Sequence, residues 1–127
     1  MDSTFFSAPS NPQGPLPLIV ALHGRGDNGR NFLAGTGLVK ANAVVVAPTG
    51  SANAWAPAPY ATTTIEQDKA RIDDIIAQSR ERFDVDAERI YAVGFSNGGG
   101  LSVYLSTLDD TFAGVASVSA AVRCTEA

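Results

Sequence analysis

The pentapeptide Gly94-Phe95-Ser96-Asn97-Gly98 places a serine between two glycines, each two positions away from it. It follows the apolar run of residues 90–95, which predicts a strand, and precedes residues 98–108, which predict a helix. A tight strand-to-helix turn strains the backbone of its serine, and a Cβ atom at either glycine position would clash. The hydroxyl of Ser96 is therefore predicted to project from the edge of the sheet as a nucleophile.

A second glycine-rich segment, Leu22-His23-Gly24-Arg25-Gly26, follows the apolar run of residues 18–22. Its glycines allow a backbone N–H group to turn toward the nucleophile, and Arg25 is the residue expected to carry that group. The N–H of Asn97, at the positive end of the predicted helix, is the expected partner. Ser96, Arg25 and Asn97 are thus the predicted catalytic residues, with the two amides forming an oxyanion hole.

His23 is the one histidine of the sequence. Its expected role is to hold neighbouring loops through its imidazole, and we assign it with Gly24 and Trp55 to the substrate-binding region. A role as base for Ser96 is the less favoured alternative. A base must reach the serine hydroxyl within about 2.6–3.2 Å while a carboxylate orients it from behind.

Residues 24–29 also match the spacing G-x-G-x-x-G after a strand, which is the pattern of a dinucleotide-binding turn. That interpretation requires an acidic residue at the end of the next strand. The corresponding segment here, Ala47-Pro48-Thr49-Gly50, contains no carboxylate. The alternative also leaves Ser96 and its flanking glycines unexplained, so nucleotide binding is the weaker hypothesis.

Four short apolar runs predict buried strands at residues 18–22, 43–47, 90–95 and 114–119, after a proline-rich loop at 8–17. Helical periodicity connects them, most clearly from a capping box at Thr63 and Glu66 onward and more weakly at residues 31–42. The alternation predicts an α/β fold of three layers, a mostly parallel sheet with helices on both faces. In the long connection of residues 48–62, Trp55 either caps the edge of the core or forms a wall of a substrate pocket.

The chain of 127 residues has the size of one domain, and its net charge of −4 does not favour nucleic-acid binding. Its single cysteine, Cys124, cannot form an internal disulfide, which fits a reducing, cytoplasmic compartment. No apolar run approaches the roughly 20 residues of a membrane span, so no membrane contact is expected. The pattern implies no metal and no organic cofactor.

The two glycine motifs, taken in order with their neighbouring segments, resemble those of α/β-hydrolase-fold serine esterases. The nearest groups are the phospholipase/carboxylesterase family and the polyhydroxybutyrate depolymerase and feruloyl esterase families. The resemblance covers residues 15–122 and implies hydrolysis of a small-molecule carboxylic ester through an acyl-serine intermediate. The segments that carry it are Leu22-His23-Gly24-Arg25-Gly26-Asp27, Ala47-Pro48-Thr49-Gly50, Val85-Asp86-Ala87-Glu88-Arg89-Ile90-Tyr91 and Gly94-Phe95-Ser96-Asn97-Gly98-Gly99.

The resemblance also implies an acid and a histidine after later strands, and neither can be assigned to a residue of this sequence. Glu126 is a weak candidate for the acid. Residues 1–127 are therefore expected to form a partial α/β-hydrolase domain, truncated after the strand that follows the nucleophile helix. The alternative is a catalytically silent fragment or binding module. The open sheet edge beside Val115 and Val118 predicts self-association or pairing with a missing C-terminal segment.

Overall fold

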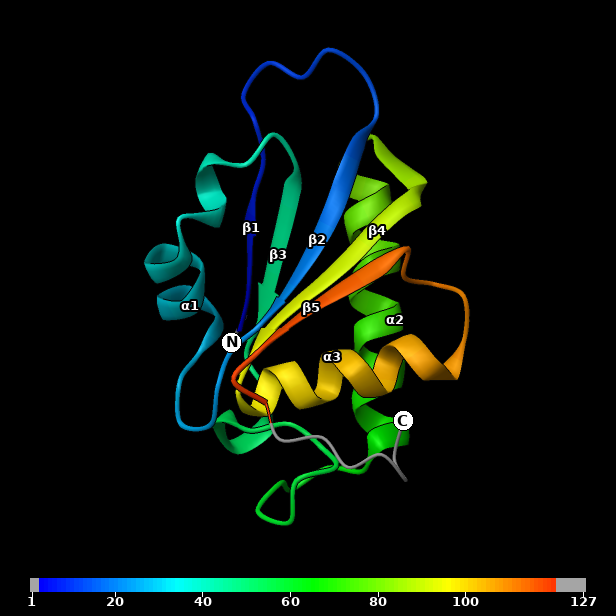
Figure 1. Ribbon diagram of the computed structural model, residues 1–127. Coiled ribbons are helices and arrows are strands. Elements are labelled where there is room, and N and C mark those ends of the chain that lie inside the picture. The colour runs from blue at the N-terminus through cyan, green and yellow to red at the C-terminus, as the bar shows by residue number, and fades with distance from the viewer. Residues whose placement is uncertain (1–2, 121–127) are drawn as a thin grey trace.

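The computed structural model describes residues 3–120, which form one five-stranded sheet with helices on both faces (Figure 1). The strands are β1 (Thr4–Ser7), β2 (Leu16–Leu22), β3 (Val44–Pro48), β4 (Val85–Phe95) and β5 (Gly114–Val118). Their order in the sheet is β1-β3-β2-β4-β5. All neighbouring pairs are parallel except β1 with β3. The predicted α/β class and mostly parallel sheet are confirmed.

The helices are α1 (Gly29–Thr36), α2 (Ile65–Arg82) and α3 (Asn97–Leu108), with 3-10 turns η1 (Leu38–Lys40) and η2 (Ser51–Asn53). Figure 1 shows α1 on one side of the sheet and α2 with α3 on the other. The packing agrees, because alternate residues of β2 enter two separate apolar clusters. Leu18 and Val20 pack with α2 and α3, whereas Ala21 packs with Leu33 of α1. The three-layer prediction is therefore confirmed.

Several element boundaries differ from the sequence prediction. Strand β1 was not predicted, and its four residues pair antiparallel with β3. Strand β2 begins at Leu16, so it includes Pro17, and its pairing with β4 shifts register between Leu16 and Leu18. A proline cannot donate a ladder hydrogen bond, which explains why the irregularity lies there. Helix α1 ends at Thr36 because Gly37 adopts a left-handed conformation with φ 75°.

The capping box of α2 is formed by Thr64 and Gln67, one position later than predicted. The hydroxyl of Thr64 accepts from the N–H of Gln67 at 3.1 Å, and the Gln67 side chain accepts from the N–H of Thr64 at 2.9 Å. The neighbouring Thr63 instead donates its hydroxyl to Asp68 at 2.9 Å. A tertiary contact therefore decides which of two adjacent threonines caps the helix.

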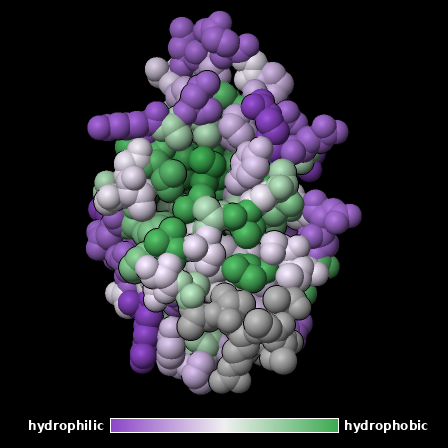
Figure 2. All heavy atoms as spheres, in the orientation of Figure 1, coloured by the Kyte–Doolittle hydropathy of each residue, from purple (hydrophilic) through white to green (hydrophobic). Residues whose placement is uncertain are grey.

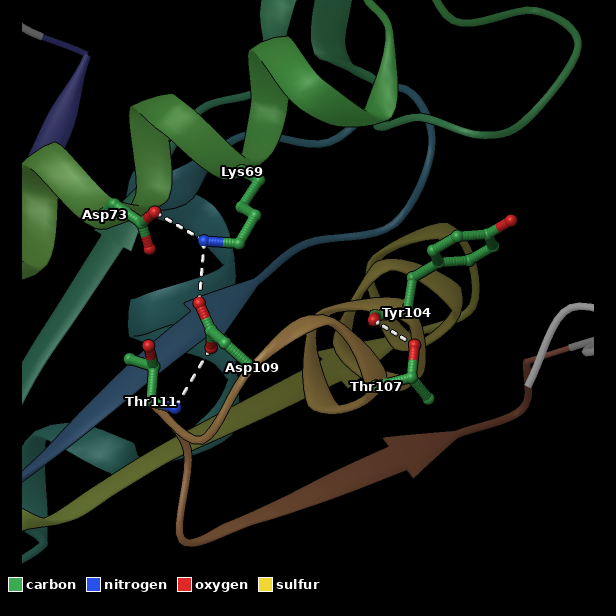
Figure 3. Close-up of polar contacts among 6 residues, drawn as sticks. All are labelled: Lys69, Asp73, Tyr104, Thr107, Asp109 and Thr111. Atoms are coloured by element: carbon green, nitrogen blue, oxygen red, sulfur yellow. Dashed lines mark hydrogen bonds and ion pairs between the residues drawn. The ribbon is translucent and has the colours of Figure 1, made fainter.

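An exposed ion-pair cluster joins α2 to the loop after α3 (Figure 3). Lys69 Nζ lies 2.6 Å from Asp73 and 2.8 Å from Asp109. The N–H of Thr111 donates to Asp109 at 3.0 Å. The hydrogen bond from Lys69, followed by those from Thr111, lowers the pKa of Asp109 to about 2. The cluster links α2 to the loop after α3 at the surface, while the shared apolar core packs both helices on the same face of the sheet.

The face that carries α1 is only partly covered. Helix α1 packs on β1, β2 and β3, whereas the β4 and β5 part of the same face holds an open apolar hollow of about 330 Å³. Figure 2 shows apolar side chains at the surface of the molecule in this view. The hollow is lined by Ile19, Tyr91, Ala92, Val93, Gly114, Val115 and Ala116. It is a feature of the sheet face and not of the strand ends that carry Ser96.

Strand β5 is the outermost described strand on this side, and Val118 is half exposed there. Association through this edge stays a prediction, which sedimentation over a series of protein concentrations would test. None of the helices between residues 3 and 120 has both the length and the apolar composition of a membrane span. Glu126 and Cys124 lie outside the described residues.

Candidate active site

Ser96 occupies the turn between the end of β4 and the start of α3, and its backbone is strained. Its φ of 53° and ψ of −111° lie outside the regions that residues with side chains ordinarily adopt. Such a conformation costs on the order of 1–3 kcal/mol and persists only where the surrounding structure enforces it. The enforcing contacts include a hydrogen bond from the N–H of Ser96 to the carbonyl of Val118 at 2.7 Å.

The two glycines that flank Ser96 are required by close backbone contacts. A Cβ atom at Gly94 would lie 2.2 Å from the carbonyl oxygen of Gly98, and one at Gly98 would lie 2.1 Å from that of Leu22. Neither position tolerates a larger residue without a backbone shift. The physical reason offered from the sequence, that these positions must lack a side chain, agrees with these contacts.

Helix α3 begins directly after the serine, so its first N–H groups have no partner within the helix. The positive end of the helix dipole lies at the same place. Both features stabilise negative charge that develops near Ser96. Asn97 carries the first of these N–H groups, and its place in an oxyanion hole stays a prediction.

The loop between β2 and α1, residues 23–28 and hereafter the β2–α1 loop, runs beside the serine turn. A Cβ atom at Gly24 would lie 3.2 Å from the ring of Phe95, the residue before Ser96. Gly26 has a φ of 82°, which turns the loop immediately after Arg25. The guanidinium of Arg25 stacks over the ring of Tyr60, 3.9 Å from its centroid. The structure thus brings together the two segments that the glycine motifs indicated.

His23 is fully buried and both of its ring nitrogens are engaged. Its Nε2 accepts from the N–H of Gly50 at 3.0 Å, so Nδ1 carries the proton and donates to the carbonyl of Gly24 at 2.6 Å. Burial lowers the pKa of His23, and the bond to Gly24 opposes only part of that shift. The imidazole is therefore neutral and structural. Its burial does not fit substrate contact, and neither nitrogen is free to act as a base for Ser96.

Trp55 is also fully buried, which does not fit the expectation that it contacts substrate. Its ring lies against the imidazole of His23, with centroids 5.2 Å apart. Its indole N–H donates to the carbonyl of His23 at 3.1 Å. The indole needs a polar partner once it leaves water, and the strand-end carbonyl supplies it. The alternative given from the sequence, that Trp55 caps the edge of the core, fits this placement better.

Two polar side chains of this region were not identified from the sequence. The side chain of Asn97 accepts from the N–H of Trp55 at 2.7 Å and donates to its carbonyl at 2.9 Å. The buried carboxylate of Asp68 accepts from the N–H of Ala56 at 2.7 Å. A signal for Asp68 was present, because it lies three residues after Ile65 on the apolar stripe of α2. Nothing in the sequence pattern marked the side chain of Asn97.

The glycine at the start of α1 has a packing role. A Cβ atom at Gly29 would lie 2.2 Å from the carbonyl oxygen of Ala47, so this glycine allows α1 to approach β3. The last glycine of the G-x-G-x-x-G match is thus explained without a nucleotide. Among residues 3–120, no group of three or more His, Cys, Asp or Glu side chains is arranged to hold a metal ion.

Comparison with known proteins agrees with this fold. No protein-family model matches the chain. The chain is 34% identical over 124 residues to NocK of Nocardia uniformis subsp. tsuyamanensis, a protein named provisionally as an esterase. The match covers 88% of this chain and 35% of NocK. Feruloyl esterase C of Emericella nidulans is 34% identical over 105 residues, covering 76% of this chain and 37% of the relative. The chain therefore spans about a third of the length of the curated relatives that it matches.

Solved structures show the same fold at lower sequence identity. A phospholipase/carboxylesterase from Dyadobacter fermentans superposes with a TM-score of 0.74 at 20% identity, covering 96% of this chain and 61% of that one. A structure titled as a dienelactone hydrolase from Klebsiella pneumoniae also gives 0.74, at 19% identity, covering 92% of this chain and 53% of that one. The chain has the α/β-hydrolase fold of these solved structures, and the relatives that it matches in sequence are named as esterases.

Proposed function

We propose that this chain carries the nucleophile and the oxyanion hole of a serine hydrolase that cleaves carboxylic esters. The observation that supports the proposal most strongly is the strained backbone of Ser96, held between β4 and the positive end of α3. Strain of this kind is expected where a turn must present one side chain outward. The names of the relatives in sequence favour the same class of reaction.

In the proposed reaction, the Oγ of Ser96 bonds to the ester carbonyl carbon while a base takes its proton. The carbonyl electron pair moves onto oxygen, and the N–H groups of Arg25 and Asn97 donate to that oxyanion. Collapse of the intermediate breaks the bond to the alcohol, which leaves with a proton returned by the base. Water then repeats the sequence on the acyl-serine and releases the acid. Small or aromatic carboxylic esters are the proposed substrates.

The base is proposed to lie outside this chain, because the one histidine of the sequence, His23, has both ring nitrogens occupied. The burial of that histidine lowers its pKa and further disfavours a role in proton transfer from Ser96. An external base can therefore substitute in a test. Imidazole in solution is a suitable one, because it titrates near neutral pH and is small enough to approach the partly exposed Ser96.

The test uses a fluorophosphonate probe with imidazole over a range of concentrations. We expect one probe molecule per chain, measured by intact mass, at a rate that increases with imidazole. Ser96→Ala must abolish the labelling, and Ser102→Ala is the matched control, because Ser102 is a buried serine of α3 bonded to the carbonyl of Gly98. Labelling that persists in Ser96→Ala, or that never occurs in the parent, would refute the proposal.

A second candidate function is a catalytically silent binding module of the same fold. The observation that favours it is the engaged, buried state of His23, which leaves residues 3–120 without a histidine able to serve Ser96. This candidate predicts that imidazole does not accelerate labelling. Turnover of a p-nitrophenyl ester above the Ser96→Ala background, with imidazole present, would exclude it.

A further inference from the structure

The segment of residues 50–56 lies between the two halves of the proposed site. Its first residue, Gly50, donates its N–H to the imidazole of His23. Its fourth residue, Asn53, accepts from the N–H of Gly26 at 2.8 Å and donates its side-chain amide to the carbonyl of Asp27 at 2.9 Å. The segment therefore contacts the β2–α1 loop at its start and in its middle.

The same segment is fixed to the serine turn through Asn97. The side-chain amide of Asn97 makes both a donor and an acceptor bond to the backbone of Trp55, and these bonds are buried. A pair of this kind fixes orientation as well as distance, because both polar groups of one residue are held at once. Asn97 follows Ser96 directly, so the position of Trp55 is set by the turn that carries the nucleophile.

Trp55 transmits that position to the β2–α1 loop. Its indole N–H donates to the carbonyl of His23, and His23 in turn donates to the carbonyl of Gly24. The chain of contacts runs from Asn97 through Trp55 and His23 to the residue before Arg25. Every side chain along it is buried, so water does not compete for these bonds.

A third attachment makes the segment rigid. Asp68 of α2, which is buried, accepts from the N–H of Ala56 and from the hydroxyl of Thr63. The end of the segment is thereby fixed to a helix of eighteen residues that packs on the sheet. A segment held to α2, to α3 and to the β2–α1 loop can set the separation of the last two.

We propose that Trp55 is a positioning residue, whose indole N–H sets the distance between the amides of Arg25 and Asn97. This proposal rests on the proposed function, because it assigns those amides to the oxyanion hole. Oxyanion donors act only within about 2.7–3.1 Å of the developing charge. A displacement of about 1 Å can cost about 100-fold in rate without removal of any donor. Trp55 thus affects the reaction without touching the substrate.

The test compares Trp55→Phe with the parent in the imidazole-assisted fluorophosphonate reaction. Trp55→Phe keeps an aromatic ring but loses the N–H that binds His23. We expect the maximal rate of labelling to fall about 10- to 100-fold, while the half-saturating concentration of the probe stays unchanged. The split between these two constants identifies positioning, because a loss of folded protein would lower the amplitude of labelling and not its rate.

Two controls separate this effect from general destabilisation. Tyr104→Phe also converts a polar aromatic residue to phenylalanine, but Tyr104 lies in the second half of α3, away from the serine turn, and it should label at the parent rate. Ile72→Val removes a methylene from the fully buried core on α2 and should lose stability with its labelling rate retained. If Trp55→Phe does not fold, Asn97→Ala serves instead, because it keeps the amide at position 97 and removes both bonds to Trp55.

The outcomes distinguish the positioning role from the proposed function. A parent that labels at Ser96 while Trp55→Phe labels equally fast overturns the positioning role alone. A parent that does not label overturns the proposed function and the positioning role together. A slower maximal rate in Trp55→Phe, with both controls at the parent rate, supports the proposal.

Discussion

Gly98 offers the sharpest test of the geometry around the serine turn, because a neighbouring glycine of the same helix provides its own control. A Cβ atom at Gly98 would lie 2.1 Å from the carbonyl oxygen of Leu22 and 2.5 Å from that of His23. A Cβ atom at Gly100, two positions further along α3, would meet nothing within 4 Å. The substitution of alanine for these two glycines should therefore act in opposite directions.

The expected magnitudes follow from these contacts. Carbon and oxygen ordinarily approach no closer than about 3.2 Å, so α3 must move about 1 Å away from β2 in Gly98→Ala, and overpacking of this kind costs about 1–3 kcal/mol. Alanine regains about 1 kcal/mol of helix propensity at either position. We expect Gly98→Ala to lose about 1 kcal/mol net, because the overpacking cost exceeds the propensity gain, and Gly100→Ala to gain up to about 1 kcal/mol.

The assay is urea unfolding followed by the fluorescence of Trp55, the one tryptophan of the sequence, which is fully buried in the folded state. The same two variants are then compared in the labelling reaction. Gly98→Ala should label more slowly, because the shift separates Asn97 from the β2–α1 loop, and Gly100→Ala should label at the parent rate. If Gly98→Ala proved as stable as Gly100→Ala, the close packing of α3 on β2 would be wrong.

Three further predictions concern strain and charge. Ser96→Gly should raise the unfolding free energy by about 1 kcal/mol, since glycine adopts the backbone angles of that turn without strain, while it abolishes labelling. The pKa of His23 is lowered in the folded state, so the unfolded chain binds the proton more readily. Stability should therefore fall as pH decreases below about 6.5, and ¹⁵N spectra should show the ring titrating at a lower pH in the folded chain than in the unfolded one. The pKa of Asp109 is also lowered, but here folding favours the charged form of the group, so the carboxylate contributes stability at neutral pH. Asp109→Asn should therefore lose a few tenths of a kcal/mol of unfolding free energy at pH 7. This loss should disappear as pH falls through about 2, which urea midpoints at both pH values would show. The expected loss is small because water screens the ion pair with Lys69, since the side chain of Asp109 is 39% accessible. Equal midpoints for Asp109→Asn and the parent at pH 7 would argue against the pair, and a His23 ring whose pKa is not lowered by folding would argue against its burial and its bonding to Gly50.

The parts of the fold that were predicted correctly are those encoded by short stretches of sequence. The apolar, β-branched run in β3 and the strand-turn-helix around Ser96 depend on neighbouring residues, and both were located from the sequence. Strand β1 could not be located in this way, because its four residues form a strand only through pairing with β3 some forty positions later, as with Phe5 opposite Ala47.

The choice of helix cap shows the same limit on a smaller scale. Thr63 with Glu66 and Thr64 with Gln67 satisfy the capping pattern equally well. The buried carboxylate of Asp68 takes the hydroxyl of Thr63, so the cap falls to Thr64. A local pattern can nominate both threonines, and only a contact made in the folded chain selects one.

The sequence by itself determined the class of fold and the turn that presents Ser96, because glycine requirements and strand periodicity act over a few residues. The tertiary structure decided the roles of His23 and Trp55. Both were placed in the substrate-binding region, although loop bonding was expected of His23 and a position at the core edge was the alternative for Trp55. Both are buried by contacts with residues 27 to 42 positions away, Gly50 and Asn97. Burial depends on what the rest of the chain brings to a side chain, which a motif does not record.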